Sequence, residues 1–184
     1  TGPQTNANKG WMKNVAHITG AIDDLSLANL INFFMDGYKQ ILSDTSFGGH
    51  VYSFNKNSGQ YNAVGSDKTI DDLFNEGMSY LTYFGHSSPN TVEFNLDNPQ
   101  NYNNTGKYPL IMVNGCNTGN LYLFDTLRPV SKGTLSEKYV FASNKGGIGF
   151  IADTHFGLPQ QLNFFTEKFD SNLSGSMYGQ SIGN

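Results

Sequence analysis

The sequence predicts an α/β domain with a mainly parallel central sheet, and three observations support this fold class. Strand candidates alternate along the chain with segments of helical periodicity. Residues 110–113 form a continuous apolar run, which is expected of a strand buried on both faces of a sheet. The 184 residues are enough for one domain with a sizeable core.

The first strand and helix are predicted close to the N-terminus. Residues 15–19 predict a strand that ends at Gly20. Apolar residues at i, i+3 and i+4 spacing then predict a helix over 27–42. Asp24 or Ser26 is the expected cap at the start of this helix.

The middle of the chain predicts two more strands around a short helix. A second strand over 50–54 leads into a polar loop. A capping-box pattern predicts a helix over 69–76, and residues 78–84, rich in Tyr and Leu, predict the third strand. The Asn-rich segment 87–107 is expected to be a long loop, and loops of this length are usually functional or mobile.

The last elements follow the buried strand at 110–113. Thr134 and Glu137 form a second capping-box pattern, and the Gly-Gly pair at 146–147 is the expected stop of that helix. Residues 148–152 predict a fifth strand. A final helix is predicted to begin near Pro159. Its apolar face is expected to carry Leu158, Leu162, Phe165 and Phe169.

Composition narrows the class of protein. The formal net charge is -4 and no basic stripe is present, which argues against nucleic acid as a partner. No apolar run approaches the roughly 18 residues that a membrane span needs. Charged residues make up only 14% of the chain, while Asn, Gly, Ser and Tyr are abundant, a composition that favours an exported bacterial protein. Residues 1–10 are interpreted as a linker or cloning remnant, and 11–184 as the domain, expected to be part of a longer protein.

Residues with reactive side chains follow four of the predicted strands. Ligands of parallel α/β sheets bind at the carboxyl ends of the strands. That rule selects residues 19–24, His86, Cys116 and residues 153–155, which should all lie on one edge of the sheet.

Cys116 and His86 together have the chemistry of a cysteine peptidase. Cysteine catalysis needs a thiolate and a group that protonates the leaving amine. Small neighbours leave the Cys116 sulfur accessible, and the ordinary pKa of a histidine suits proton transfer near neutral pH. We therefore expect the two side chains to face each other across an open cleft. The alternative makes Cys116, the single cysteine, an inert core residue and His86 a turn residue.

The chain resembles the gingipain-type cysteine peptidases, peptidase family C25, from about residue 11 to residue 184. Four segments carry the resemblance: YFGHSS at 83–88, PLIMVNGCNTG at 109–119, LSE at 135–137 and GIGFIA at 147–152. In that family one strand ends at a Gly-His pair and the next at the nucleophilic cysteine. The resemblance assigns Cys116 as the nucleophile, His86 as its acid/base partner, and the backbone N–H groups of Ser87 and Cys116 as the oxyanion hole.

The resemblance also implies a fold and a setting. It implies a three-layer caspase-like sandwich, cleavage of polypeptides outside the cell, and a secreted or cell-surface location through the type IX secretion route of Bacteroidetes. A further α/β subdomain upstream in the same protein is expected as a partner. Gingipain-type peptidases also carry structural calcium, and the Asp/Asn-rich loop is the candidate site for it here, although no EF-hand spacing is present. The candidate ligands are Asp97, Asn98, Asn101 and Asn103.

Two residues depart from the family pattern. Ser87 stands where the family has a glycine, and serine does not freely adopt positive φ. Thr19 stands where the family has an acid that orients the histidine, and a threonine supplies no charge. The resemblance implies a substrate pocket lined by Asp23, Asp24, Asp153, Thr154, His155 and Phe156. The alternative treats the three aspartates as solvated turn residues.

The other histidines are not expected at the site. His17 is interpreted as a satisfied core residue, and His50 as the start of a strand. Zinc is improbable with one Cys and four scattered His, and no cofactor is expected to be required. The predicted function is a cysteine endopeptidase. Two alternatives stay open: a type IX secretion signal peptidase that transfers its cargo, and a non-catalytic binding module.

Overall fold

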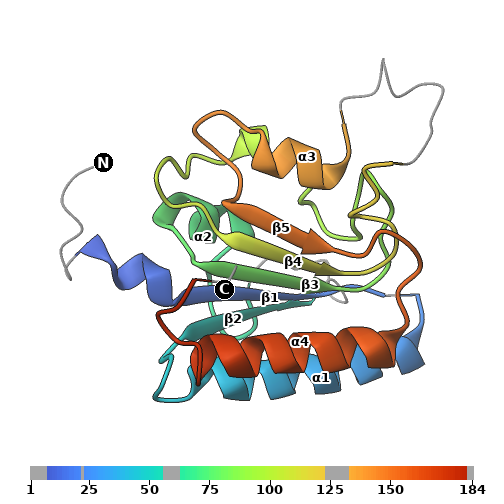
Figure 1. The fold of residues 1–184 in the computed structure, drawn as a ribbon, viewed down its shortest axis with the longest axis horizontal. Coiled ribbons are helices and arrows are strands. Elements are labelled where there is room, and N and C mark those ends of the chain that lie inside the picture. The colour runs from blue at the N-terminus through green and yellow to red at the C-terminus, as the bar shows by residue number, and fades with distance from the viewer. Residues whose placement is uncertain (1–7, 22, 56–62, 123–132, 182–184) are drawn as a thin grey trace.

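A parallel sheet of five strands forms the centre of the protein (Figure 1). The computed structural model describes residues 8–21, 23–55, 63–122 and 133–181. Within these residues the strand order is β2-β1-β3-β4-β5. The strands are β1 (Asn14–Thr19), β2 (His50–Asn55), β3 (Tyr80–Phe84), β4 (Leu110–Asn114) and β5 (Gly149–Ala152). The helices are α1 (Leu25–Ser43), α2 (Ile70–Glu76), α3 (Leu135–Val140) and α4 (Pro159–Ser174).

Helices cover both faces of the sheet, as the three-layer prediction requires. Figure 1 shows α2 and α3 on one face and α1 and α4 on the other. The core under α2 and α3 is apolar and includes Ile18, Phe74, Leu81, Val113 and Tyr139. On the opposite face, strand residues such as Val15, Tyr80 and Met112 pack toward α1 and α4. The predicted α/β fold with a parallel sheet is confirmed.

The helix starts follow the capping patterns in the sequence. The Asp24 carboxylate accepts from the Leu27 N–H at 3.0 Å, so Asp24 rather than Ser26 caps α1. Both predicted capping boxes are present, with Thr69 before α2 and Thr134 before α3. The prediction for the end of α3 is wrong. That helix stops at Val140 rather than at Gly146, because the chain turns at Phe141 and the N–H of Gly146 instead donates to the Asn104 side chain at 3.1 Å.

The predicted apolar face of α4 is confirmed in part, because Leu162 and Phe169 pack against the core on this side of the sheet. Leu158 and Phe165 are 61% and 53% exposed. The buried side chains of α4 are polar: Thr166, Asp170 and Ser174. Thr166 has a partner across the helix–sheet interface, because its hydroxyl donates to the Asn114 side-chain oxygen at 3.1 Å. The side of α4 that faces the sheet therefore carries buried polar groups as well as apolar side chains.

Buried polar groups continue along this side of the sheet. His17 is buried in the core as predicted, where its ring meets that of Tyr38 edge to face at 6.3 Å, and among the described residues neither ring nitrogen has a hydrogen-bond partner of normal geometry. Burial first, and then the charge of Lys39, lowers the pKa of His17 to about 3. Burial raises the pKa of Asp170 to about 8. Both groups are therefore uncharged near neutral pH.

The remaining segments are more ordered than their composition predicts. The segment after β3 includes a 3-10 helix, η4 (Pro99–Asn101), and buries Val92, Phe94, Leu96 and Tyr102. The predicted linker overlaps a second 3-10 helix, η2 (Gly10–Lys13), while residues 1–7 lie outside the described residues. Part of the predicted polar loop, 56–62, also lies outside them.

His50 begins β2 as predicted. Among the described helices, none has the length and apolar character needed to cross a membrane.

Candidate active site

The carboxyl ends of the central strands lie in register. Thr19 pairs with Phe84, and Phe84 pairs with Asn114. The hydrogen-bond ladder continues one residue past each strand, because Gly20 N–H donates to Phe84 O at 2.7 Å and Gly85 N–H donates to Asn114 O at 3.1 Å. The parallel sheet thus brings the backbone that leads into His86 beside the backbone that leads into Cys116. The prediction of one shared sheet edge is confirmed.

Cys116 lies in a tight turn directly after β4. It is a free cysteine and the residue is partly exposed, so it is not a fully buried core residue. The turn is held by the segment that follows β5. Asn117 N–H donates to His155 O at 2.9 Å, and Gly119 N–H donates to Asp153 O at 2.8 Å. Asn117 has a φ of 60°, one of the few non-glycine residues in the left-handed region.

His86 is exposed directly after β3, and its backbone carbonyl is held by a tyrosine of that strand. The Tyr83 hydroxyl donates to His86 O at 2.6 Å and accepts from Glu93 N–H at 3.1 Å. Burial raises the pKa of Tyr83, so this hydroxyl keeps its proton near neutral pH. Gly20 makes room for it, since a Cβ there would lie 2.3 Å from the hydroxyl oxygen. The exposed imidazole is thereby carried on a fixed backbone.

Ser87 joins the His86 segment to the Cys116 turn. Its hydroxyl donates to Cys116 O at 2.9 Å and accepts from the Thr118 hydroxyl at 2.8 Å. The two candidate catalytic residues therefore lie on segments that are directly bonded to each other. Within the described residues, no side-chain hydrogen bond to the His86 ring is observed.

The segment after β5 forms the border of the site next to the Cys116 turn. Thr154, His155 and Phe156 are exposed, and the rings of His155 and Phe156 meet edge to face at 4.8 Å. Asp153 is half-buried, and one carboxylate oxygen, Oδ2, is buried without a hydrogen-bond partner. Burial raises the pKa of this carboxyl. A Cβ on Gly157 would lie 2.9 Å from that oxygen and 2.9 Å from Gly115 O, so the carboxylate lies close to the backbone before Cys116.

The two aspartates that follow β1 lie at the surface, and one of them is used as a helix cap. Asp23 and Asp24 are both exposed, and the carboxylate of Asp24 caps α1. A different carboxylate, Glu93, reaches the end of β1, where it accepts from the Ala21 N–H at 2.5 Å. No pattern in the sequence indicates this role for Glu93, because it lies in the loop after β3 and far along the chain from Ala21.

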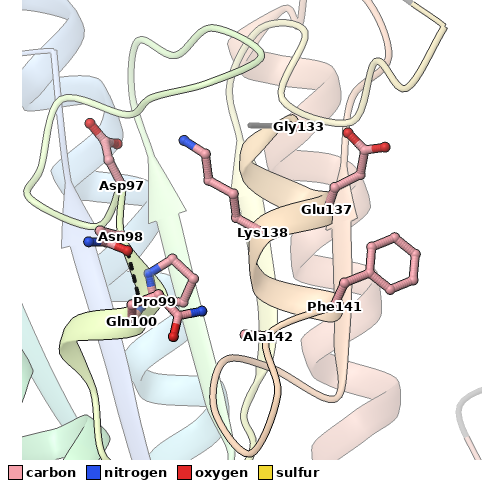
Figure 2. A pocket seen from close by; sticks show the side chains of 9 residues that line it. All are labelled: Asp97, Asn98, Pro99, Gln100, Gly133, Glu137, Lys138, Phe141 and Ala142. Carbon is pink, nitrogen blue, oxygen red and sulfur yellow. Dashed lines mark hydrogen bonds between the residues drawn. The ribbon is translucent and has the colours of Figure 1, made fainter. Parts of the chain in front are cut away.

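A groove of about 740 Å³ lies between the 97–100 segment and α3, beside the loop that follows His86 (Figure 2). Figure 2 shows Lys138 extending between Asp97 and Glu137, while Phe141 points away from the 97–100 segment. Sequence reasoning placed no substrate contact here. The groove adjoins the candidate site through the backbone, since the N–H of Leu135, the first residue of α3, donates to Pro89 O at 2.8 Å.

The proposed calcium ligands are used in local structure. Asp97 accepts from the Thr91 hydroxyl at 2.7 Å, and the Asn98 side chain accepts from Gln100 N–H at 3.2 Å. Asn98 also donates to Asn101, whose side chain lies 3.3 Å away. Over the described parts of the chain, no three His, Cys, Asp or Glu side chains gather as ligands. Calcium binding at this loop, which includes Asn103, stays a prediction.

Solved structures of gingipains share this fold. The Arg-specific cysteine proteinase gingipain R (RGPB) aligns with a TM-score of 0.61 at 20% identity, over 92% of this chain and 38% of its own. A complex of Porphyromonas gingivalis RgpB pro- and mature domains aligns with a TM-score of 0.60 at 19% identity, over 91% and 38%. A structure described as a protease aligns with a TM-score of 0.65 at 18% identity, over 86% and 32%. These likenesses confirm the caspase-like sandwich expected from the resemblance.

The chain spans less than two-fifths of the length of each of these structures. No relative among the curated proteins matches the sequence. A sequence profile of one peptidase family, described as "Peptidase family C25", matches residues 3–184, which is nearly the whole chain. Together with the fold and the neighbouring Cys116 and His86 segments, this match shows that the chain belongs to peptidase family C25.

Proposed function

We propose that this domain is the catalytic part of a secreted cysteine endopeptidase, with Cys116 as nucleophile and His86 as acid/base. The observation that carries the proposal is the hydrogen-bonded contact between the two segments that hold these residues. A partly exposed cysteine at the carboxyl edge of a parallel sheet lies where ligands of such sheets bind.

The proposed reaction proceeds in two stages. The Cys116 thiol gives its proton to His86 as the sulfur attacks the scissile carbonyl carbon, and the resulting oxyanion is stabilised by the backbone N–H groups of Cys116 and Ser87. The C–N bond then breaks as His86 gives a proton to the leaving amine, which leaves a thioester on Cys116. In the second stage His86 takes a proton from water as the water attacks the thioester, which releases the acid product and the thiol.

Substrate recognition is proposed to use the segment after β5. Asp153 combines a position beside the Cys116 turn with a buried carboxylate oxygen that has no hydrogen-bond partner. Such an oxygen is satisfied by a basic side chain of the substrate through charge-assisted hydrogen bonds. Thr154, His155 and Phe156 are proposed to border this pocket, and Asp23 and Asp24 to contribute charge from the end of β1.

The solved structures that resemble this chain suggest what surrounds the domain in the full-length protein. The chain covers only part of each gingipain structure that it resembles, and one of those structures contains a pro-domain. We propose that a further α/β subdomain of the same protein completes the enzyme, that the protein is exported to the cell surface or beyond, and that calcium stabilises it.

The decisive test is covalent labelling of Cys116 by a peptidyl acyloxymethyl ketone. Labelling of the wild-type protein, with adduct mass on the Cys116 peptide, is the expected result, and Cys116→Ala is the matched control that should take no label while remaining folded. A sulfur that alkylates with iodoacetamide but ignores the peptidyl reagent would contradict the proposal and favour a non-catalytic module. Transfer of the acyl group to an added amine, in place of hydrolysis, would favour the transpeptidase.

A further inference from the structure

The hydroxyl of Ser87 is fully engaged with the Cys116 turn. It donates its hydrogen to Cys116 O at 2.9 Å and accepts from the Thr118 hydroxyl at 2.8 Å. Thr118 is completely buried, and its hydroxyl lies 3.4 Å from the same Cys116 carbonyl. The three groups therefore form a closed cluster that ties the residue after His86 to the turn that carries the sulfur.

Gly115, the residue before Cys116, leaves the space that this cluster occupies. A Cβ on Gly115 would lie 2.1 Å from Ser87 Oγ and 2.9 Å from Gly85 O. The serine hydroxyl therefore occupies the space that a side chain at Gly115 would need. A glycine in place of Ser87 would keep its backbone N–H but would leave the Cys116 carbonyl without this donor.

We propose that Ser87 is a positioning residue, whose hydroxyl holds the Cys116 turn at a fixed distance from the His86 segment. The inference rests on the proposed peptidase function and deepens it. The hydroxyl spans the two residues whose backbone N–H groups are proposed to stabilise the oxyanion, so it sets the spacing of that pair. Oxyanion donors act only when held close to where the charge develops, and misplacement by about 1 Å can cost about 10²-fold in rate.

The hydroxyl does not act on the sulfur itself. Its partners are a backbone carbonyl and another hydroxyl, and no described contact joins it to the sulfur atom. Loss of the hydroxyl should therefore slow the steps that build up an oxyanion and leave simple alkylation of the sulfur unchanged. That separation distinguishes positioning from a general loss of structure.

The experiment compares Ser87→Ala with Ser88→Ala, whose hydroxyl stays within its own turn and accepts from Asn90 N–H at 3.4 Å. In a form of the protein that retains peptidase activity, Ser87→Ala should lower kcat by about 10- to 100-fold with little change in KM. The rate of iodoacetamide alkylation and its pH profile should stay within about 2-fold, because alkylation needs the thiolate but no oxyanion. Ser88→Ala should match the wild type in every measurement.

Two further variants test whether the hydroxyls act as one unit. Ser87→Thr keeps the hydroxyl and should recover most of kcat. The double variant Ser87→Ala with Thr118→Val should be no slower than Ser87→Ala alone, because groups that act together give non-additive effects. An unchanged kcat in Ser87→Ala, or additive losses in the double variant, would overturn the proposal.

Hydrogen exchange supplies a readout that does not depend on activity. The amides of Asn117 and Gly119 are bonded to the segment after β5, and they should exchange about 3- to 10-fold faster in Ser87→Ala once the turn is released. Unchanged exchange would show that Ser87 does not hold the turn. If the wild-type protein cleaves no peptide, the proposed peptidase is contradicted, and the exchange rates then decide separately whether Ser87 holds the turn.

Discussion

At the scale of single residues, the candidate site depends on side chains whose hydrogen bonds run to backbone. Tyr83 holds the carbonyl of His86, and Ser87 holds the carbonyl of Cys116. Among the described residues, no bond of this kind involves the side chain of Cys116 or of His86. We therefore expect different effects from substituting the residues proposed to react with the substrate and the residues proposed to recognise it.

His86→Ala should separate bond formation from proton transfer. In an active form of the protein, it should still be labelled slowly at Cys116, because the thiol is the bond-forming atom. Turnover should fall by about 10²–10⁴-fold, the usual contribution of a general acid/base group. Parallel assays of labelling rate and peptide hydrolysis check this. Equal losses in both would instead assign His86 a role in forming the thiolate.

Asp153→Asn should reduce any preference for basic side chains on the acyl side of the cut. One carboxylate oxygen of Asp153 is buried without a partner, and a substrate Arg gains most if its contact is bidentate. Profiling with a peptide library, in which the variant and wild type are compared, measures the effect. Wild-type preference for Leu, Phe or small residues would contradict a carboxylate pocket while leaving the roles of Cys116 and His86 standing.

At the scale of elements, helix ends rather than helix faces are the best-defined features. The capping box before α3 is closed in both directions, with the Thr134 hydroxyl accepting from Glu137 N–H and the Glu137 carboxylate accepting from Thr134 N–H at 2.7 Å. This short helix has few residues with which to stabilise itself, so its cap carries much of its stability. The cap also fixes the start of α3 beside Pro89.

Thr134→Ala should destabilise the protein by about 1 kcal/mol, the usual cost of losing an N-cap hydroxyl. Thr134→Ser is the matched control, because it keeps the hydroxyl and loses only a methyl group. Urea unfolding of the two variants and the wild type measures the difference. A loss in Thr134→Ser as large as that in Thr134→Ala would show that the methyl group, and not the cap, is the stabilising part.

At the scale of the whole molecule, the ionisation of two buried side chains, Asp170 of α4 and His17 of β1, makes the free energy of unfolding depend on pH. Asp170 has its pKa raised from 3.8 to about 8 by burial, and His17 has its pKa lowered from 6.5 to about 3, chiefly by burial. Between pH 4 and 8 the unfolded chain releases the Asp170 proton while the folded protein keeps it, so the free energy of unfolding falls as pH rises. His17 acts in the opposite sense, but only between about pH 3 and pH 6.5.

Between pH 6.5 and pH 8, Asp170 therefore contributes to the pH dependence of the free energy of unfolding while His17 does not. There the free energy of unfolding should fall by up to about 1.4 kcal/mol per pH unit, relative to Asp170→Asn, which has no proton to release. Chemical unfolding at several pH values, with the variant as reference, measures this difference. Asp170→Leu is a second reference, in case the amide destabilises the helix. Parallel slopes for the wild type and both variants would contradict a neutral, buried Asp170.

The order of elements, the parallel sheet and the position of the reactive residues at strand ends were all determined by the sequence itself. Strand length, apolar runs and capping patterns are local, and they fix where β3 and β4 end. What only the tertiary structure decided lies between segments that are distant along the chain. The length of α3, the buried polar groups of α4, the contact of Glu93 with Ala21, and the bond from Ser87 to Cys116 depend on which backbones the sheet brings together. Periodicity carries no information about such partners, because a side chain far along the chain leaves no trace in the local pattern.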